Sequence, residues 1–143
     1  MLGRNLLAGL ILVSALATVV ADLGFMHASN DAWPGHAKMH AVWGVFHVLG
    51  THAIALGLLF VGTLNLLRVR IAALILLAYT ISFFVALAVG PAFGGAAKPD
   101  LPAHMMPPEL FGLDGNMLSF LVGLPVLSYA WWRSERELRR TTA

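Results

Sequence analysis

The sequence predicts an all-α integral membrane protein, a bundle of four transmembrane helices that forms one domain over residues 1–143. The chain is 59% hydrophobic and only 11% charged, too little charge for the surface of a soluble domain. Helices are expected because the alternating pattern of barrel strands is missing and isolated strands are not stable in lipid. Four apolar stretches are long enough to cross the hydrocarbon layer as helices. They are Asn5–Gly24, His40–Leu67, Ile71–Val89 and Asn116–Trp132.

The first apolar stretch has two interpretations. Arg4 precedes an apolar run, and Val19, Val20 and Ala21 have the small side chains of a cleavage site, as in a secretory signal. We expect the segment to stay in the protein and to form the first transmembrane helix.

Charged residues are divided unevenly between the two ends of the predicted helices. Lys38 and Lys98 lie at one end, whereas the arginines flank the other, so the positive-inside rule places both termini in the cytoplasm. This topology predicts a multi-pass protein of the cell inner (plasma) membrane. The short turn Arg68–Arg70 is expected to join helices two and three. The arginines at the cytoplasmic end are Arg4, Arg68, Arg70, Arg133, Arg136, Arg139 and Arg140.

The charged run at the C-terminal end, residues 135–140, is short and has no aromatic residues within it. That pattern is typical of a solvated face next to a membrane, so lipid is an expected partner and nucleic acid is not.

The polar residues gather at the outer end of the predicted bundle. The two outer connections, about residues 25–39 and 90–115, are long and rich in Pro, Gly, His and acidic residues, and loops of this length are usually functional. We therefore expect the functional site at this end. The residues concerned are Asp22, His27, Asn30, Asp31, His36, His40, His104, Glu109, Asp114 and Asn116.

Four residues of the second apolar segment are predicted to share one helix face. His36, His40, Trp43 and His47 fall within roughly 60° of one another, because each residue of an α-helix advances by about 100°. This stripe would descend into the membrane, where ionisable groups are costly and tend to mark functional sites. Interfacial anchoring and hydrogen bonding to a neighbouring helix are the alternatives for each histidine. His52 falls on nearly the opposite side, where an interhelical hydrogen bond is the simpler expectation.

The residue types present limit the chemistry of this stripe. The chain has no cysteine, which excludes disulfides, thiolate metal sites and a cysteine nucleophile. His36 and His40 have the i, i+4 spacing of two imidazoles on one metal, but the glutamate of a His-Glu-x-x-His site is missing between them. A haem needs one axial histidine, an apolar pocket and interfacial polar groups for its propionates. Lys38 and Trp33 are suited to that last role.

Two short motifs resemble a known family. Trp33–His40, ending in Lys-Met-His, and Phe111–Leu121, with Phe-Gly followed by Gly-Asn-Met-Leu-Ser-Phe-Leu, resemble segments of the styrene oxide isomerases. These are small four-helix membrane enzymes. The resemblance implies that His40 ligates ferric haem b, that subunits assemble as a trimer, and that the iron acts as a Lewis acid turning an epoxide into a carbonyl compound. Lys38 matches an arginine of the family motif and Asn116 matches its aspartate.

The sequence departs from the family pattern at two positions. The family's asparagine, six residues after the ligand, corresponds to Phe46, and its tyrosine on helix three corresponds most nearly to Phe84. The resemblance implies a haem-b-dependent isomerase, or a related Lewis-acid enzyme, whose small apolar substrate enters from the bilayer. In that interpretation His40 is the metal ligand, the cofactor-binding residues are His40, His36, Lys38, Trp33 and Trp43, and the catalytic pocket residues are His47, Asn116 and Tyr79.

Two other classes of protein fit the same residues. A non-catalytic metal-, haem- or quinone-binding subunit of a larger membrane complex would use His36 and His40. In a lipid-binding or purely structural tetraspan protein, replacing His40 and His47 would leave all activity unchanged. His104, with Met105 and Met106, is a further candidate set of soft-metal ligands.

Three polar residues near helix ends have expected structural roles. Asp114 and Asn116 precede or open the fourth helix, where either side chain can accept hydrogen bonds from free backbone donors. Asp22 lies near a helix C-terminus, where a negative charge is unfavourable. A charged partner such as His27, His36 or Lys38 would explain it.

Overall fold

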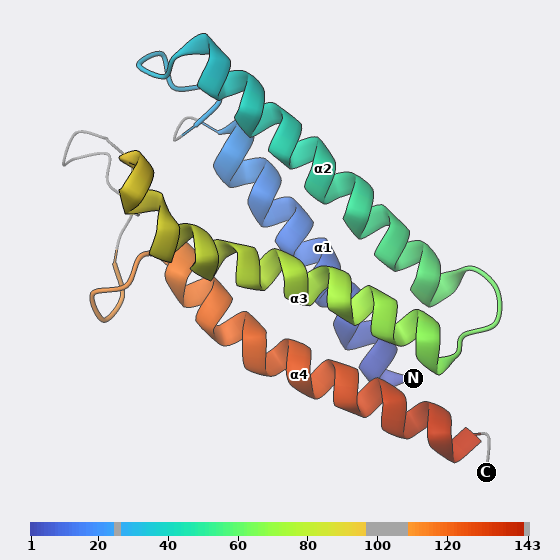
Figure 1. The fold of residues 1–143 in the computed structure, drawn as a ribbon. Coiled ribbons are helices and arrows are strands. Elements are labelled where there is room, and N and C mark those ends of the chain that lie inside the picture. The colour runs from blue at the N-terminus through green and yellow to red at the C-terminus, as the bar shows by residue number, and fades with distance from the viewer. Residues whose placement is uncertain (25–26, 97–108, 142–143) are drawn as a thin grey trace.

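The structure, a computed structural model, describes residues 1–24, 27–96 and 109–141. Within these ranges the chain is helical and has no β-strand, which confirms the all-α class (Figure 1). Three sequence features, Lys98, His104 and the Met105–Met106 pair, lie outside the described residues. The elements are α1 (Leu2–Leu23), α2 (Gly35–Phe60), α3 (Leu66–Val89), the 3-10 turn η1 (Gly90–Phe93) and α4 (Gly115–Thr141).

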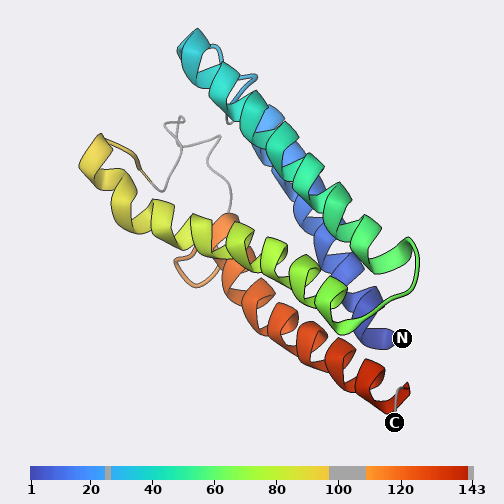
Figure 2. The ribbon, with the colours of Figure 1, turned by 45° about the vertical axis from the view of Figure 1, so that its right-hand side comes forward.

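The four helices form a ring in which consecutive helices pack together and α1 also packs against α4. We call the end with both termini and the α2–α3 loop the inner end, and the opposite end the outer end. Figures 1 and 2 show that the α1–α2 pair and the α3–α4 pair lie close at the inner end and diverge toward the outer end. The buried core lies accordingly in the inner half, where Leu7, Ile11, Leu59, Val69 and Leu127 are almost fully enclosed.

Three of the described helices are long and apolar enough to cross a membrane, namely Leu2–Leu23, Gly35–Phe60 and Leu66–Phe93. Helix α4 has 27 residues but is less apolar as a whole, because it combines Asn116 near its start with the charged run after Trp132. The multi-pass character predicted from composition is therefore supported by three helices.

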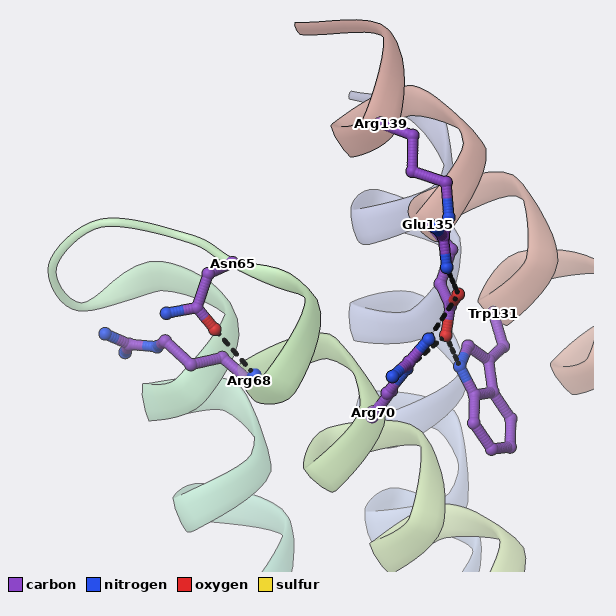
Figure 3. Close-up of polar contacts among 6 residues, drawn as sticks. All are labelled: Asn65, Arg68, Arg70, Trp131, Glu135 and Arg139. Carbon is purple, nitrogen blue, oxygen red and sulfur yellow. Dashed lines mark hydrogen bonds and ion pairs between the residues drawn. The ribbon is translucent and has the colours of Figure 1, made fainter. Parts of the chain in front are cut away.

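The connection between α2 and α3 differs from the prediction. Arg68–Arg70 were expected to form the turn, but they lie within α3, and the turn is formed by residues 61–65. Asn65 sets the boundary, because its Oδ1 accepts a hydrogen bond of 3.0 Å from the backbone N of Arg68 (Figure 3). Gly62 has a φ of 76°, a conformation that favours glycine. The Arg68 side chain donates hydrogen bonds to the carbonyls of Gly57 and Leu58, near the end of α2. It also donates to the carbonyl of Val61, the residue that follows this helix.

Glu135 joins α3 to α4 at the inner end. Its carboxylate accepts hydrogen bonds from Arg70 Nε at 2.7 Å and Arg70 Nη2 at 3.1 Å, and from Trp131 Nε1 at 2.9 Å (Figure 3). Arg139 Nη2 adds a contact of 3.3 Å. These interactions, led by the Arg70 hydrogen bond, lower the pKa of Glu135 to about 2.

Helices α1 and α4 pack closely at Gly3. A Cβ atom at this position would lie 2.6 Å from Ser134 Oγ and 2.7 Å from Ser134 Cα. The backbone N of Gly3 also donates to Glu137 Oε2 at 3.2 Å. Only a residue without a side chain allows this contact, so the core at the inner end depends on it.

Candidate functional site

The histidine stripe lies on the outward face of α2. His36, His40 and His47 are exposed, and 64% of Trp43 is accessible. The opposite face of α2, which includes Val45 and His52, packs against the other helices. The stripe therefore faces away from the interior of the bundle.

His36 and His40 contact each other directly. Their Nε2 atoms lie 3.0 Å apart, and their rings meet edge to face with centroids 4.6 Å apart. The Trp43 ring follows at 5.9 Å from the His40 ring. In a hydrogen bond between two such nitrogens one donates and the other accepts, so one Nε2 carries no proton. Within the described ranges, no group of three or more His, Cys, Asp or Glu side chains is placed to hold a metal ion.

The two histidines border an open depression of about 670 Å³ at the outer end. Its other wall holds Asp22 at the end of α1 and His27, whose Nδ1 lies 3.3 Å from Asp22 Oδ1. The partner expected for Asp22 is therefore His27. The lining residues are Asp22, His27, Trp33, Pro34, His36, Ala37, His40, Ala41 and Gly44.

Trp33 lines this depression, and Lys38 lies five residues later in the same segment. The Trp33 ring meets the His27 ring edge to face at 4.8 Å and is half-buried. Lys38 is half-buried as well, and its Nζ reaches only a long contact of 4.0 Å with Asp31. An indole and an ammonium group thus lie within the segment that opens α2, near the pair of histidines.

The residues expected to form the catalytic pocket are not gathered around His40 within one chain. Asn116 is exposed in the first turn of α4, and the cap of that helix is Asp114, whose Oδ1 accepts from Met117 N at 2.9 Å. His47 lies farther along the exposed face of α2. Tyr79 points into the bundle from α3, toward Thr18 of α1.

A second polar cluster, which sequence reasoning largely missed, surrounds Tyr79. Its Oη lies 2.7 Å from Thr18 Oγ1, and its ring meets the His52 ring edge to face at 5.3 Å. His52 Nε2 in turn lies 2.8 Å from Ser14 Oγ. The interhelical hydrogen bond expected of His52 is confirmed. The spacing of Ser14, Thr18 and Asp22, four residues apart in an otherwise apolar helix, is a signal in the sequence that could have indicated this cluster.

The residues present fit one face of a haem. His40 and Trp33 line a mostly apolar depression, and Lys38 lies in the same segment without lining it. The lining comes from α1, α2 and their connection, so the opposite face of a planar cofactor would need residues from elsewhere.

Comparison of the chain with models of protein families, with curated proteins and with solved structures found no match. The fold and the site together define a helical protein with at least three helices able to span a membrane and with a histidine-bearing face at its outer end.

Proposed function

We propose that this chain is a haem-b-binding enzyme of the cell inner membrane, with His40 as the iron ligand. In this proposal α4 forms a fourth span, and both termini lie in the cytoplasm with the arginine-rich inner end. The proposed reaction is the rearrangement of a small apolar epoxide to a carbonyl compound, as the resemblance to the styrene oxide isomerases implies. Ferric haem, when bound, would supply the Lewis acid for that reaction.

The observation that carries the proposal is the outward-facing stripe of His36, His40 and Trp43. Ionisable side chains that face lipid are costly and tend to mark functional sites. His40 Nε2 contacts His36 Nε2, so this contact would be exchanged for the bond to iron when haem binds. Lys38 and Trp33 would hold the cofactor's carboxylates at the interface, and Trp43 would cover its apolar body.

The open side of this face supports a homo-oligomer. A second copy of the chain would cover the stripe and exclude water and lipid from the reacting atoms. His47 would then line the substrate pocket from α2, and Asn116 would orient substrate oxygen if a neighbouring subunit brings α4 to it. Tyr79, which points into its own bundle, would not reach this pocket in the arrangement seen here. A trimer is the assembly that the resemblance implies.

Purification in detergent followed by an absorption spectrum tests the cofactor. We expect a Soret band at one haem per chain, either directly or after haem supplementation, and conversion of a small aryl epoxide to an aldehyde by the loaded protein. A preparation that shows no Soret band after supplementation would rule out His40 as a haem ligand. A loaded protein that leaves the epoxide unchanged would retain the haem site and refute the isomerase activity.

A second function is favoured by the separation of 3.0 Å between His36 Nε2 and His40 Nε2. Two imidazoles that converge in this way suit a bare transition metal, with further ligands from another chain. The protein would then be a non-catalytic metal- or quinone-binding subunit of a larger complex. Stoichiometric metal without haem, together with co-purifying larger proteins, would support this function over the first.

A further inference from the structure

The inner end carries more positive charge than its own carboxylates neutralise. Seven arginines but only two glutamates, Glu135 and Glu137, belong to this end. Figure 3 shows Arg70 and Arg139 converging on Glu135, with nitrogen–oxygen distances of 2.7 and 3.3 Å. Arg133 Nε lies 2.9 Å from Glu137 Oε1. Both acidic side chains of this end are therefore already paired.

Arg136 and Arg140, in the last turns of α4, have no carboxylate partner among the described residues. Both side chains are exposed. They are four residues apart, which is about 6 Å along the helix axis. The guanidinium carbon of Arg136 lies over the Trp132 ring, 5.2 Å from its centre, in a cation–π contact. This arginine pair is therefore available to an anion from outside the chain.

The arginine pair shares a face of α4 with two aromatic residues. Tyr129, Trp132 and the two arginines fall within about 80° of one another around the helix. The rings of Tyr129 and Trp132 lie 5.8 Å apart, and about half of each residue is exposed. The aromatic pair and the arginine pair therefore point away from the bundle together. The buried positions of these turns lie on the opposite face and are Leu127, Ala130, Ser134 and Leu138.

The order of side chains along this face matches the layers of a phospholipid. Val122 and Val126 are exposed on the same side of α4, before the aromatic pair, and suit the acyl chains. Tyr and Trp are enriched at the level where chains meet head groups. The arginine pair follows at the level of the phosphate. An apolar face that leads directly to the two arginines favours a lipid over a soluble polyanion.

We infer that this face of α4 binds an anionic phospholipid, with the lipid phosphate between Arg136 and Arg140 and the aromatic pair beside its glycerol backbone. A zwitterionic lipid also has a phosphate, but its own positive group offsets the attraction to the arginines, so the site prefers a head group of net negative charge. The inference rests on the proposed crossing of α4 and is independent of haem.

Native mass spectrometry of the full chain in detergent tests this inference by titration with two lipids. Phosphatidylglycerol and phosphatidylcholine with identical acyl chains differ in net charge alone. We expect phosphatidylglycerol to bind about 25-fold more tightly, about fivefold for each arginine. The preference should decrease with added salt, because the head group and the arginines are exposed. Equal dissociation constants for the two lipids would overturn the inference.

Three single variants separate this pair from the general charge of the inner end. Arg136→Gln and Arg140→Gln should each reduce the preference by about fivefold. Arg133→Gln removes the same charge from the same helix, but Arg133 is already paired with Glu137, so it should leave the preference unchanged. An exposed pair contributes little to stability, so this control should fold. Equal losses in all three variants would attribute the preference to net charge and contradict the assignment.

Soluble competitors distinguish a lipid from other phosphates. Neither glycerol 3-phosphate nor a short oligonucleotide, at the concentration of the lipid, should displace phosphatidylglycerol, because neither has acyl chains for the apolar face. Displacement by glycerol 3-phosphate would assign the arginines to a soluble phosphate, and displacement by the oligonucleotide would assign them to nucleic acid. Either result would overturn the inference. A protein with a Soret band but no lipid preference would overturn this inference alone and leave the proposed haem site in place.

Discussion

At the scale of single residues, His36 and His40 occupy the same face and contact each other, yet the proposed haem site assigns them unequal roles. His40→Ala should abolish haem retention, because nothing in the stripe replaces an axial bond. His36→Ala should retain haem with at most an altered affinity, because it removes a contact to His40 Nε2 and leaves the axial ligand in place. Soret absorbance after purification and haem titration measures both.

His47 provides the internal comparison for this assignment. It lies on the same exposed face but about 10 Å deeper than His40 along the helix axis, so His47→Ala should keep the cofactor and change turnover. The reverse order, with haem lost from His47→Ala and kept in His40→Ala, would move the ligand toward the membrane centre and refute the motif-based assignment.

The sequence could predict which residues share a helix face, but not which face packs against the other helices. The i, i+4 and i+7 spacing of His36, His40 and Trp43 follows from helix geometry alone. Helix α2 is apolar nearly all round, so periodicity carries little information about which side is buried. The contact between Ser14 and His52 joins residues 38 positions apart, and no local pattern specifies such a pair.

At the scale of helices, the packing of α1 against α4 depends on the absence of a side chain at Gly3. Gly3→Ala would place a methyl group against the backbone of Ser134, which should destabilise the protein by about 1–3 kcal/mol. A methyl group added at Gly9, on the same helix, would have no neighbouring atom within 4 Å, so Gly9→Ala should be neutral or stabilising. Thermal unfolding in detergent, followed by circular dichroism, compares the two. Equal stability of both variants would contradict the close approach.

The link between α3 and α4 predicts a dependence of stability on pH. Because the pKa of Glu135 is lowered from its ordinary value of 4.5 to about 2, the ionised carboxylate stabilises the folded state. Its contribution is fully present above pH 4.5 and is lost as the pH falls through about 2. The midpoint of thermal unfolding should decrease over this window in the wild type. In Glu135→Gln this part of the decrease should be missing, and an identical pH profile in both proteins would contradict the interaction with Arg70.

The boundary between α2 and α3 shows which residues determine where α3 begins. Arg68 and Arg70 interrupt the apolar run, which favoured a turn at this point, but arginine is a good helix former and both residues lie in the first turns of α3. Asn65, a residue type that is preferred at helix N-caps, marked the true start. The outer depression could not be predicted in the same way, because it depends on where the end of α1 meets the start of α2.

At the scale of the whole molecule, charge and burial follow the same axis. The arginines and the enclosed core lie at the inner end, whereas the depression lined by α1, α2 and their connection lies at the outer end. Figure 2 shows that the two helix pairs diverge toward this end. The positions of the charged and polar residues along the sequence were sufficient to predict this polarity, because the hydrocarbon layer excludes charges from the middle of each span. The same information did not establish whether α4 crosses the membrane, because the final turns of this helix are charged. A direct experiment is needed for this helix.

The absence of cysteine from the chain permits such a test with single introduced cysteines. Ser29, Thr63 and Arg140 are exposed in the outer connection, the α2–α3 loop and the last turn of α4. With four spans and cytoplasmic termini, a membrane-impermeant maleimide should label Ser29→Cys in intact spheroplasts, and it should label Thr63→Cys and Arg140→Cys only after permeabilisation. The arginine-rich inner end would be retained on the cytoplasmic side in this topology. Labelling of Arg140→Cys in intact spheroplasts, with Thr63→Cys protected, would place the end of α4 outside and refute the fourth span.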